Sequence, residues 1–221
     1  MGFEIFAPPD ADATPHGWGG RLCLMIVNSV LWRRGPAPEE TLQSYDQLIE
    51  RVAKAGWLSD PHALRDDARA HPRRAARALA TALELREALF SAFSAVAADH
   101  PPTQAAIRLI EQHAATGLAT LHLEPRPEPG AHGEPGHRLR YRWSRPTLDT
   151  PTCLIAVSAA LLLTAPELDR VKQCPGPTCG WVFLDTTRNR SRQWCETSEC
   201  SNRHRARTHY QRRQRQHRDE R

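Results

Sequence analysis

Two pairs of cysteines give this sequence its clearest structural signal: Cys174-Pro-Gly-Pro-Thr-Cys179 and, after 15 further residues, Cys195-Glu-Thr-Ser-Glu-Cys200. Four of the six cysteines thus fall within 27 residues, in two C-x4-C pairs. Four soft thiolates in two pairs on either side of a spacer can complete the closed tetrahedral shell that a structural zinc ion requires. Pro and Gly in the first pair favour the tight turn that such a site needs. The spacing therefore predicts zinc bound by all four cysteines.

Three other interpretations of the cluster remain. Two disulfides would require an exported chain, because disulfides are rare in reducing compartments. Four unrelated thiols would not place Pro and Gly around the first pair. An iron–sulfur cluster could use the same four ligands, although its commonest cysteine spacings differ. The other two cysteines, Cys23 and Cys153, lie in apolar runs.

The spacer between the two pairs predicts a β-hairpin over the metal. Gly180-Trp-Val-Phe-Leu-Asp185 is a short aromatic and β-branched run, and Gln193-Trp-Cys195 resumes an extended pattern after a polar stretch. Trp181 and Phe183 fall on one face of the first strand, and the aliphatic residues 182 and 184 fall on the other. We expect the rings to form the small core of the module; a stacking platform for bases is the alternative.

The motif of this module extends past the last cysteine. It reads Cys174-x4-Cys179-Gly180-Trp181-x-Phe183-x-Asp185-x-Thr187-x-Asn189-x-Ser191-Arg192-x-Trp194-Cys195-x4-Cys200-Ser201-Asn202-Arg203. This string resembles the CGNR zinc-finger family of bacterial transcription regulators. Upstream, Leu22–Trp32 is similar to the start of the ABATE domain that is usually joined to that finger, and Leu85–Leu89 resembles the central helix of that domain.

The resemblance implies a helical N-terminal domain that senses a stress or a small molecule, and a zinc module that binds DNA. One residue departs from the family pattern, because the glycine that helps to name the family is Ser201 here. If that position needs a positive φ, serine costs roughly 1–2 kcal/mol more than glycine and the turn differs locally. Metal ligation is expected to survive, because all four thiols remain.

Charge is divided unevenly along the chain. The net charge is +5, yet from Arg188 onward 11 Arg stand against 4 acidic residues, so that segment carries +7 and the other 187 residues carry −2. Such asymmetry indicates a segment that binds polyanions. The most apolar segment, Cys153–Leu163, has 11 residues, whereas crossing a bilayer takes about 20. The N-terminus has no basic stretch before an apolar one, so we expect a cytoplasmic protein that makes no membrane contact.

Apolar periodicity predicts a mainly α N-terminal domain with one inserted β-hairpin. The expected helices cover about residues 20–34, 38–56, 73–98, 102–114 and 151–163, and the hairpin pairs 118–124 with 137–143. The last helix is apolar almost all round and should lie in the middle of the domain. A small four-Cys zinc module follows, made of a hairpin and a basic helix in a treble-clef or ribbon-like arrangement. The predicted domains are 1–170 and 171–221.

Two polar residues interrupt the apolar faces of the N-terminal helices. Asn28 lies inside an apolar helix, where its amide needs a hydrogen-bond partner; a structural bond is favoured over a polar anchor in a ligand pocket. Arg86 interrupts the strongest apolar stripe, and a buried guanidinium needs an acidic partner or an anion. The neighbouring Glu84 and Glu87 point elsewhere on the helix, so the partner of Arg86 is expected to be distant. Asn28 and Arg86 are the candidate ligand-binding residues.

The segment from Ser201 onward has the pattern of a polar, Arg-rich helix. Arg203 and Arg207 share one stripe and are expected to lead the contacts with base edges in a DNA groove. Further nucleic-acid contacts are assigned to Arg205, Arg212 and Arg213 on the same segment and to Arg188, Arg190 and Arg192 in the spacer. The alternative is a solvated, partly disordered tail that binds polyanions without sequence preference.

These features together predict a zinc-dependent, DNA-binding transcription regulator whose N-terminal domain senses a small-molecule effector or mediates the formation of a homodimer. Double-stranded DNA is the expected partner and zinc the expected cofactor. An RNA-binding or ribosome-associated zinc-ribbon protein is the alternative, since Arg-rich tails serve there too. The sequence shows no recognisable pair of nucleophile and base, so an enzyme is not expected.

Overall fold

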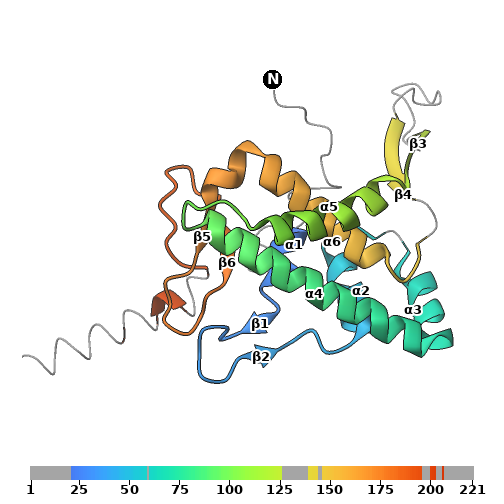
Figure 1. Ribbon diagram of the computed structural model, residues 1–221, viewed down its shortest axis with the longest axis horizontal. Helices are drawn as coiled ribbons and strands as arrows, with labels where there is room; N and C mark the ends of the chain where they lie inside the picture. The colour runs from blue at the N-terminus through green and yellow to red at the C-terminus, as the bar shows by residue number, and fades with distance from the viewer. Residues whose placement is uncertain are drawn as a thin grey trace, which may run out of the picture.

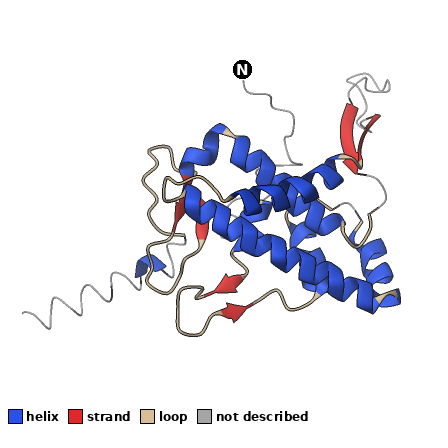
Figure 2. Cartoon of the chain, viewed as in Figure 1, coloured by secondary structure: helices blue, strands red, loops and turns tan. Residues whose placement is uncertain are grey.

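The computed structural model describes residues 21–58, 60–125, 139–143, 146–195, 200–202 and 206. Its elements are, in chain order, α1 (Leu22–Val27), β1 (Val30–Leu31), β2 (Glu39–Glu40), α2 (Tyr45–Lys54), α3 (Pro61–Ala70), α4 (Pro72–Val96), α5 (Gln104–Leu118), β3 (Leu121–Pro125), β4 (Leu139–Trp143), α6 (Thr150–Thr164), the 3-10 helix η3 (Pro166–Arg170), β5 (Val171–Gln173) and β6 (Val182–Leu184). Figure 1 shows the helices gathered into one body, with β3–β4 and β5–β6 at opposite ends of the view. Figure 2 shows how short the strands are beside the helices. The predicted mainly α fold with an inserted hairpin is confirmed.

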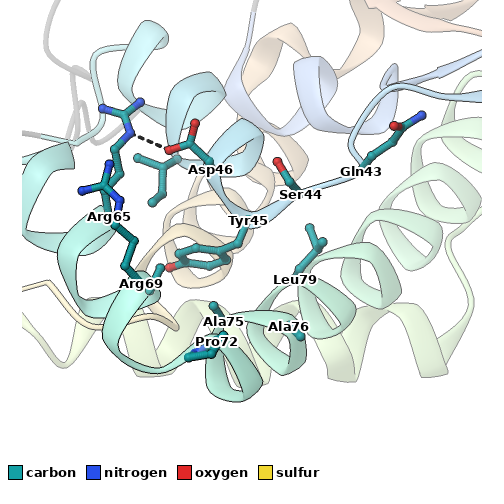
Figure 3. Close-up of a pocket in the computed structure, with 12 residues that line it drawn as sticks. Gln43, Ser44, Tyr45, Asp46, Arg65, Arg69, Pro72, Ala75, Ala76 and Leu79 are labelled. Atoms are coloured by element: carbon teal, nitrogen blue, oxygen red, sulfur yellow. Dashed lines mark hydrogen bonds and ion pairs between the residues drawn. The ribbon is translucent and has the colours of Figure 1, made fainter.

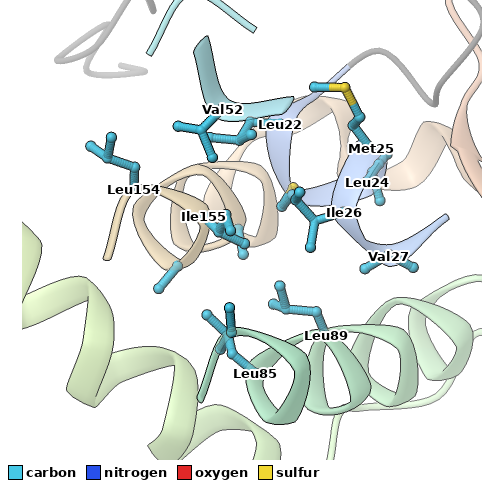
Figure 4. Close-up of a cluster of buried hydrophobic side chains, with 14 of the residues drawn as sticks. Leu22, Leu24, Met25, Ile26, Val27, Val52, Leu85, Leu89, Leu154 and Ile155 are labelled. Atoms are coloured by element: carbon cyan, nitrogen blue, oxygen red, sulfur yellow. The ribbon is translucent and has the colours of Figure 1, made fainter. Parts of the chain in front are cut away.

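Helix α6 lies at the centre of the helical body. It has no polar face, so it cannot be stable with any side exposed. Its residues Leu154 and Ile155 are buried, and Figure 4 shows Ile155 on the side of α6 that faces Leu85 and Leu89 of α4. The predicted central position of this helix is confirmed. None of the helices that the structure describes combines the length and the apolar character needed to cross a membrane.

Helices α5 and α6 approach each other closely at Gly117. A Cβ atom on Gly117 would lie 3.1 Å from the Cβ of Cys153 and 3.1 Å from Cγ2 of Val157. Glycine therefore permits the short distance between the two backbones. Cys153 and Cys23 are both buried free thiols of the helical body, and burial raises the pKa of Cys23 to about 11.

Helix α5 ends at Leu118, four residues beyond its predicted end, because residue 118 extends the helix and does not begin the strand. Helices α1 and α2 differ more from the prediction. Helix α1 ends at Val27, well before the expected end near residue 34, because the chain turns at Asn28 and β1 then pairs with β2. For the same reason α2 begins after Ser44 and not near residue 38. The hydroxyl of Ser44 accepts a hydrogen bond from the N–H of Gln47, and the Gln47 side chain bonds back to the N–H of Ser44. This capping box fixes the start of α2.

Helix α3 was not predicted from the sequence. Leu64 alone among its ten residues is buried, so the segment has almost no apolar periodicity. Its start is set instead by local chemistry, because the Asp60 carboxylate accepts hydrogen bonds from the N–H groups of His62 and Ala63 and Pro61 occupies the first helical position. Such capping is a weaker sequence signal than a repeated apolar stripe.

The hairpin of the C-terminal module differs from the prediction. Strand β6 pairs with β5, which precedes the first cysteine pair, and residues 186–195 contain no strand. The predicted pairing with residues 193–195 is therefore wrong, because that segment belongs to a loop folded around a buried carboxylate. The predicted division of faces is confirmed: Phe183 lies in the cysteine cluster, whereas Val182 and Leu184 belong to the core of the helical body.

Candidate metal centre and nucleic-acid interface

The four cysteines of the two C-x4-C pairs converge on one point. Their Sγ atoms all lie within 4.8 Å of one another, and all four residues are buried. The Sγ atom of Cys195 lies 3.6 Å from that of Cys179 and 3.7 Å from that of Cys200. Zn–S bonds of about 2.3 Å at tetrahedral angles place sulfur atoms about 3.8 Å apart. Cys174, Cys179, Cys195 and Cys200 therefore fit the predicted zinc ion.

The burial of four neighbouring cysteine thiols favours a bound cation at their centre. Hydrogen-bonded contacts with Cys174 and Cys179, and then burial, raise the pKa of Cys195. Burial is also the main cause that raises the pKa of Cys200. Four buried thiols cannot all ionise against one another, whereas a divalent cation at their centre stabilises the thiolates. When bound, zinc supplies a closed structural centre with no open coordination position.

A tight turn and a ring complete the module around the cysteines. The N–H of Cys179 donates to the carbonyl of Gly176 at 3.0 Å, and a Cβ on Gly176 would lie 3.0 Å from the Cβ of Cys179. The glycine is thus required by the closeness of the turn to the metal ligands. Phe183 is fully buried beside the cysteines, and Trp181 and Trp194 pack against the same cluster. The rings form the small core that the sequence predicts.

A buried carboxylate organises the loop that follows β6. Asp185 is inaccessible to solvent, and its Oδ1 accepts from both the N–H and the hydroxyl of Thr187. Its Oδ2 accepts from Nζ of Lys172 at 2.6 Å and from the N–H of Arg192 at 3.0 Å. The Lys172 ammonium also donates to the main-chain carbonyls of Arg190 and Arg192. One ion pair thus ties loop 185–192 to β5.

The charge state of Asp185 follows from these bonds. Burial by itself raises the pKa of this carboxyl group, but the hydrogen bonds from Lys172 and Thr187 outweigh burial and hold the pKa at about 2. Sequence reasoning missed both Asp185 and Lys172 as site residues. The available signal was that Lys172 is one of only two lysines in a chain that otherwise uses arginine.

The three arginines of this loop differ in exposure: two face solvent and one packs inside the module. Arg188 and Arg190 are exposed, and the described residues offer their side chains no hydrogen-bond or ion-pair partner. Arg190 has a φ of 52°, which is held in place by its N–H bond to the carbonyl of Thr187 and by the bond from Lys172 to its own carbonyl. Arg192 points inward: its guanidinium lies 4.8 Å from the centre of the Phe183 ring and donates to the main-chain carbonyls of residues 194 and 195.

Asn28 joins the module to the helical body. Its Nδ2 donates to the carbonyl of Val182 at 2.8 Å, and its Oδ1 accepts from the N–H of Val182 at 3.0 Å. The carbonyl of Trp181 accepts from the N–H of Cys174, and the N–H of Asp185 donates to the carbonyl of Arg170; these two partners flank β5. Main-chain groups alternate between the two edges of a strand, so the N–H and the carbonyl of Val182 point to the edge of β6 that faces away from β5. The Asn28 amide therefore takes the place of a third strand at that edge. This is the structural bond that the sequence favoured.

Other contacts fix the same junction. The indole N–H of Trp181 donates to the carbonyl of Val30 at 2.9 Å, and Gln173 Nε2 donates to the hydroxyl of Ser94 in α4 at 2.9 Å. The side chain of Arg34 lies across Gly180, where a Cβ would be 2.9 Å from Cγ of Arg34. Gly180 also has a φ of 75°, so both its conformation and its neighbour require glycine. The module is therefore docked on the helices and shares their core.

Arg86 has internal partners as well. Its Nη1 donates to Glu40 at 2.6 Å and to the hydroxyl of Ser29 at 2.9 Å, which confirms a distant acidic partner. Its Nε donates to Glu87 at 2.9 Å, so the expectation that Glu87 points elsewhere is wrong. Glu87 can turn back because it also pairs with Arg33 at 2.6 Å on the same side. The protein itself thus satisfies the guanidinium of Arg86.

The helical body contains a groove elsewhere, of about 520 Å³, between α2, α3 and α4. Ala75, Ala76 and Leu79 contribute apolar surface to it, and Figure 3 shows the ion pair between Arg65 and Asp46 on its wall. Neither of the two predicted ligand-binding residues lines this groove.

The described residues include only the start of the Arg-rich segment. Cys200 and Ser201 are buried and, like residues 202 and 206, have helical backbone. Ser201 does not have a positive φ, so the departure from the family glycine causes no backbone strain there. The remaining predicted nucleic-acid contacts lie outside the described residues: Arg203, Arg205, Arg207, Arg212 and Arg213.

Two family models match the chain. Residues 170–213 match the CGNR zinc finger, and residues 20–166 match ABATE, described as "Putative stress-induced transcription regulator". No curated protein is similar enough to give a match. The two matched ranges agree with the two resemblances seen in the sequence, and the longer one covers more than half of the chain. The chain therefore belongs to the ABATE family and carries a CGNR zinc finger.

Proposed function

We propose that this protein is a zinc-dependent, DNA-binding transcription regulator. The observation that carries the proposal is the exposed pair Arg188 and Arg190, on a loop whose inner side is held by the buried ion pair of Asp185 and Lys172. Because this loop is ordered before binding, its guanidinium groups meet phosphates with little loss of conformational freedom. The Arg-rich segment continues from the same module, and the net charge from Arg188 onward is +7. A site closed by four cysteines supports a structural and not a catalytic role for the zinc.

The proposal gives the arginines two roles. Arg188 and Arg190 contact phosphates and position the module on the duplex. Arg203 and Arg207 lead the contacts with base edges, where a bidentate arginine contributes about 1–3 kcal/mol of discrimination. The other arginines of the segment contact the sugar–phosphate backbone: Arg205, Arg212 and Arg213. Arg192, which bonds inside the module, is left out of this interface.

Selection of bound sequences from random duplex DNA, with the zinc-loaded full chain, tests the proposal. The double variant Arg188→Gln/Arg190→Gln should then bind every sequence more weakly and flatten the log–log salt dependence by about 0.9 for each phosphate that it no longer neutralises. The matched control is Arg73→Gln/Arg74→Gln, two exposed arginines of α4 outside the module. A loop variant with the salt dependence of the wild type, or a wild type that selects no sequence, would contradict the proposal.

An RNA-binding role is the second candidate. The observation that favours it is the partial exposure of Trp181 and Trp194, since aromatic rings can stack on unpaired bases. Competition between duplex DNA and single-stranded RNA of the same sequence, at one salt concentration, separates the two roles. Preference for the RNA, with loss of that preference in Trp194→Leu, would favour the second role.

For effector sensing we propose the groove between α2, α3 and α4, because Asn28 and Arg86 are engaged by the protein itself. Ala76 lines this groove and is exposed, whereas the exposed Ala80 on the same helix does not line it. Small molecules that raise the unfolding temperature of the wild type should lose that effect in Ala76→Trp and keep it in Ala80→Trp. Ligands that stabilise both variants equally would place sensing elsewhere.

A further inference from the structure

The groove between α2, α3 and α4 has two arginines on one of its walls. Arg65 and Arg69 lie one turn apart on α3 and both line the groove, so their guanidinium groups can contact the same ligand. Figure 3 shows both side chains on one side of the groove, with Leu79 of α4 on the other. Among the described residues that line the groove, the remaining charged one is Asp46. Two arginines and one aspartate give the lining a net charge of +1.

Asp46 orients Arg65 and leaves most of its hydrogen-bond donors available. The Nε of Arg65 donates to Oδ1 of Asp46 at 2.6 Å, and within the described part of the chain its two Nη groups make no hydrogen bond. The Arg65 side chain is 25% exposed, so its outer edge is held near one position. Arg69 pairs with Asp66, but these side chains are 74% and 75% exposed, and an ion pair so open to water is weak. Both guanidinium groups are therefore open to an anion in the groove.

The other side of the groove is apolar. Ala75, Ala76 and Leu79 line it from α4, and the two small alanines leave room beside the ring of Tyr45. The Tyr45 hydroxyl donates to the carbonyl of Leu148 at 2.7 Å, so the ring has a fixed place in the wall. A fixed aromatic ring favours stacking or edge contacts with a second ring. The volume of about 520 Å³ lies within the roughly 300–1,000 Å³ of small-molecule sites.

We propose that this groove binds a small organic anion with a planar apolar body and one carboxylate. The inference rests on the proposed role of the groove in effector sensing and names the class of effector. The carboxylate lies against Arg65 and Arg69, because the planar fork of a guanidinium matches the two oxygens of a carboxylate. One negative charge balances the net charge of the lining. The apolar body lies along Ala76 and Leu79 beside the ring of Tyr45, where it removes apolar surface from water.

The first test separates the charge of the ligand from its shape. Isothermal titration calorimetry of the zinc-loaded full chain, without nucleic acid, measures the dissociation constants of three probes: naphthoate, its neutral analogue naphthamide, and inorganic phosphate. Naphthoate should bind at least about tenfold more tightly than either of the others, because it alone fits both the arginines and the apolar side. Naphthamide or phosphate that binds as tightly as naphthoate would overturn the proposal. Naphthoate that does not bind would overturn it as well.

The second test removes one positive charge inside or outside the groove. Arg69→Gln removes it from the wall, whereas Arg74→Gln removes it from an exposed position of α4 that does not line the groove. Both side chains are exposed, so neither substitution should disturb the core. Arg69→Gln should raise the dissociation constant of naphthoate about tenfold, and Arg74→Gln should leave it within about threefold of the wild type. Equal dissociation constants in the two variants would overturn the proposal.

The outcomes also distinguish this inference from the proposed function. If naphthamide binds as tightly as naphthoate and its binding is lost in Ala76→Trp, the groove remains the effector site but the effector is not an anion. If naphthoate binding depends on Arg69 in a protein that selects no DNA sequence, the class of ligand stands and the DNA-binding role does not.

Discussion

Replacing Asn28 with leucine tests whether the zinc module and the helical body unfold as one unit. The substitution keeps the number and branching of the side-chain heavy atoms and removes both hydrogen bonds to Val182. The N–H and the carbonyl of Val182 then lose partners that lie at 3.0 and 2.8 Å. Water cannot replace these partners, because Asn28 is 1% exposed and Val182 is fully buried.

The expected magnitude follows from the two orphaned groups. A buried main-chain group left without a partner costs about 1–3 kcal/mol, so two of them cost about 2–6 kcal/mol. The buried leucine returns part of this cost through its apolar surface, about 1 kcal/mol or more. We therefore expect the free energy of unfolding to fall by about 1–5 kcal/mol, against the 5–15 kcal/mol that is typical of a folded domain.

Urea unfolding of the zinc-loaded protein measures this change with two signals. Far-UV circular dichroism reports on the helices, and a chromogenic chelator reports on zinc release. Both transitions should move together to lower urea in Asn28→Leu. The control is Asn189→Leu, the same exchange at an exposed loop position, which should stay within about 0.5 kcal/mol of the wild type. Unchanged helix unfolding in Asn28→Leu, whether or not zinc release shifts, would refute the idea of a shared unit.

Three further substitutions test other parts of the structure. Cys195→Ala removes one of the four metal ligands and should lose zinc on dialysis, whereas Cys23→Ala, outside the cluster, should keep it; elemental analysis that finds full zinc in both would contradict the site. Asp185→Asn turns an amide N–H toward donors that the carboxylate now accepts, and should cost about 2–4 kcal/mol in urea unfolding. In the folded protein the pKa of Asp185 is about 2, below the value near 4 of the unfolded chain. The carboxylate therefore contributes fully to the free energy of unfolding above about pH 4, and this contribution is lost as the pH falls toward 2. The wild type should therefore lose more stability than Asp185→Asn between about pH 5 and pH 3, and equal losses would argue against this role. Gly180→Ala should lower thermal stability by about 1–2 kcal/mol because of its φ of 75°, and adding Arg34→Ala should recover only the steric part; an unchanged unfolding temperature in the single variant would contradict this account.

The features that the sequence could predict are those with a repeating or spaced signal. The four cysteines of the metal centre are recognisable because two equal spacings recur around one spacer. Helices α4 and α6 are recognisable because apolar residues repeat over many turns, as at Leu85 and Leu89 in α4. The hairpin β3–β4 is likewise recognisable from its alternation. In each case a local pattern and the final packing require the same residues.

The features that could not be predicted depend on contacts between distant segments. Helix α1 ends where Asn28 reaches Val182, 154 residues later, and nothing near Asn28 signals that partner. The pairing of β6 with β5 was missed because the loop after β6 is shaped by Asp185, whose burial is set by Lys172 on the other strand. A lone Asp after a strand has the same sequence pattern as an ordinary turn. Tertiary contacts therefore decided both local structures.

The shared core limits how the zinc module can move. A finger tethered by a linker can pivot to suit many arrangements of its target, but this module has Val182 and Leu184 among the buried side chains of the helices. Turning it would open that core and break the bonds of Asn28. The helical body therefore sets the direction in which Arg188 and Arg190 face. In any assembly of two copies, the contact between the helical bodies would then fix the distance between the two zinc modules.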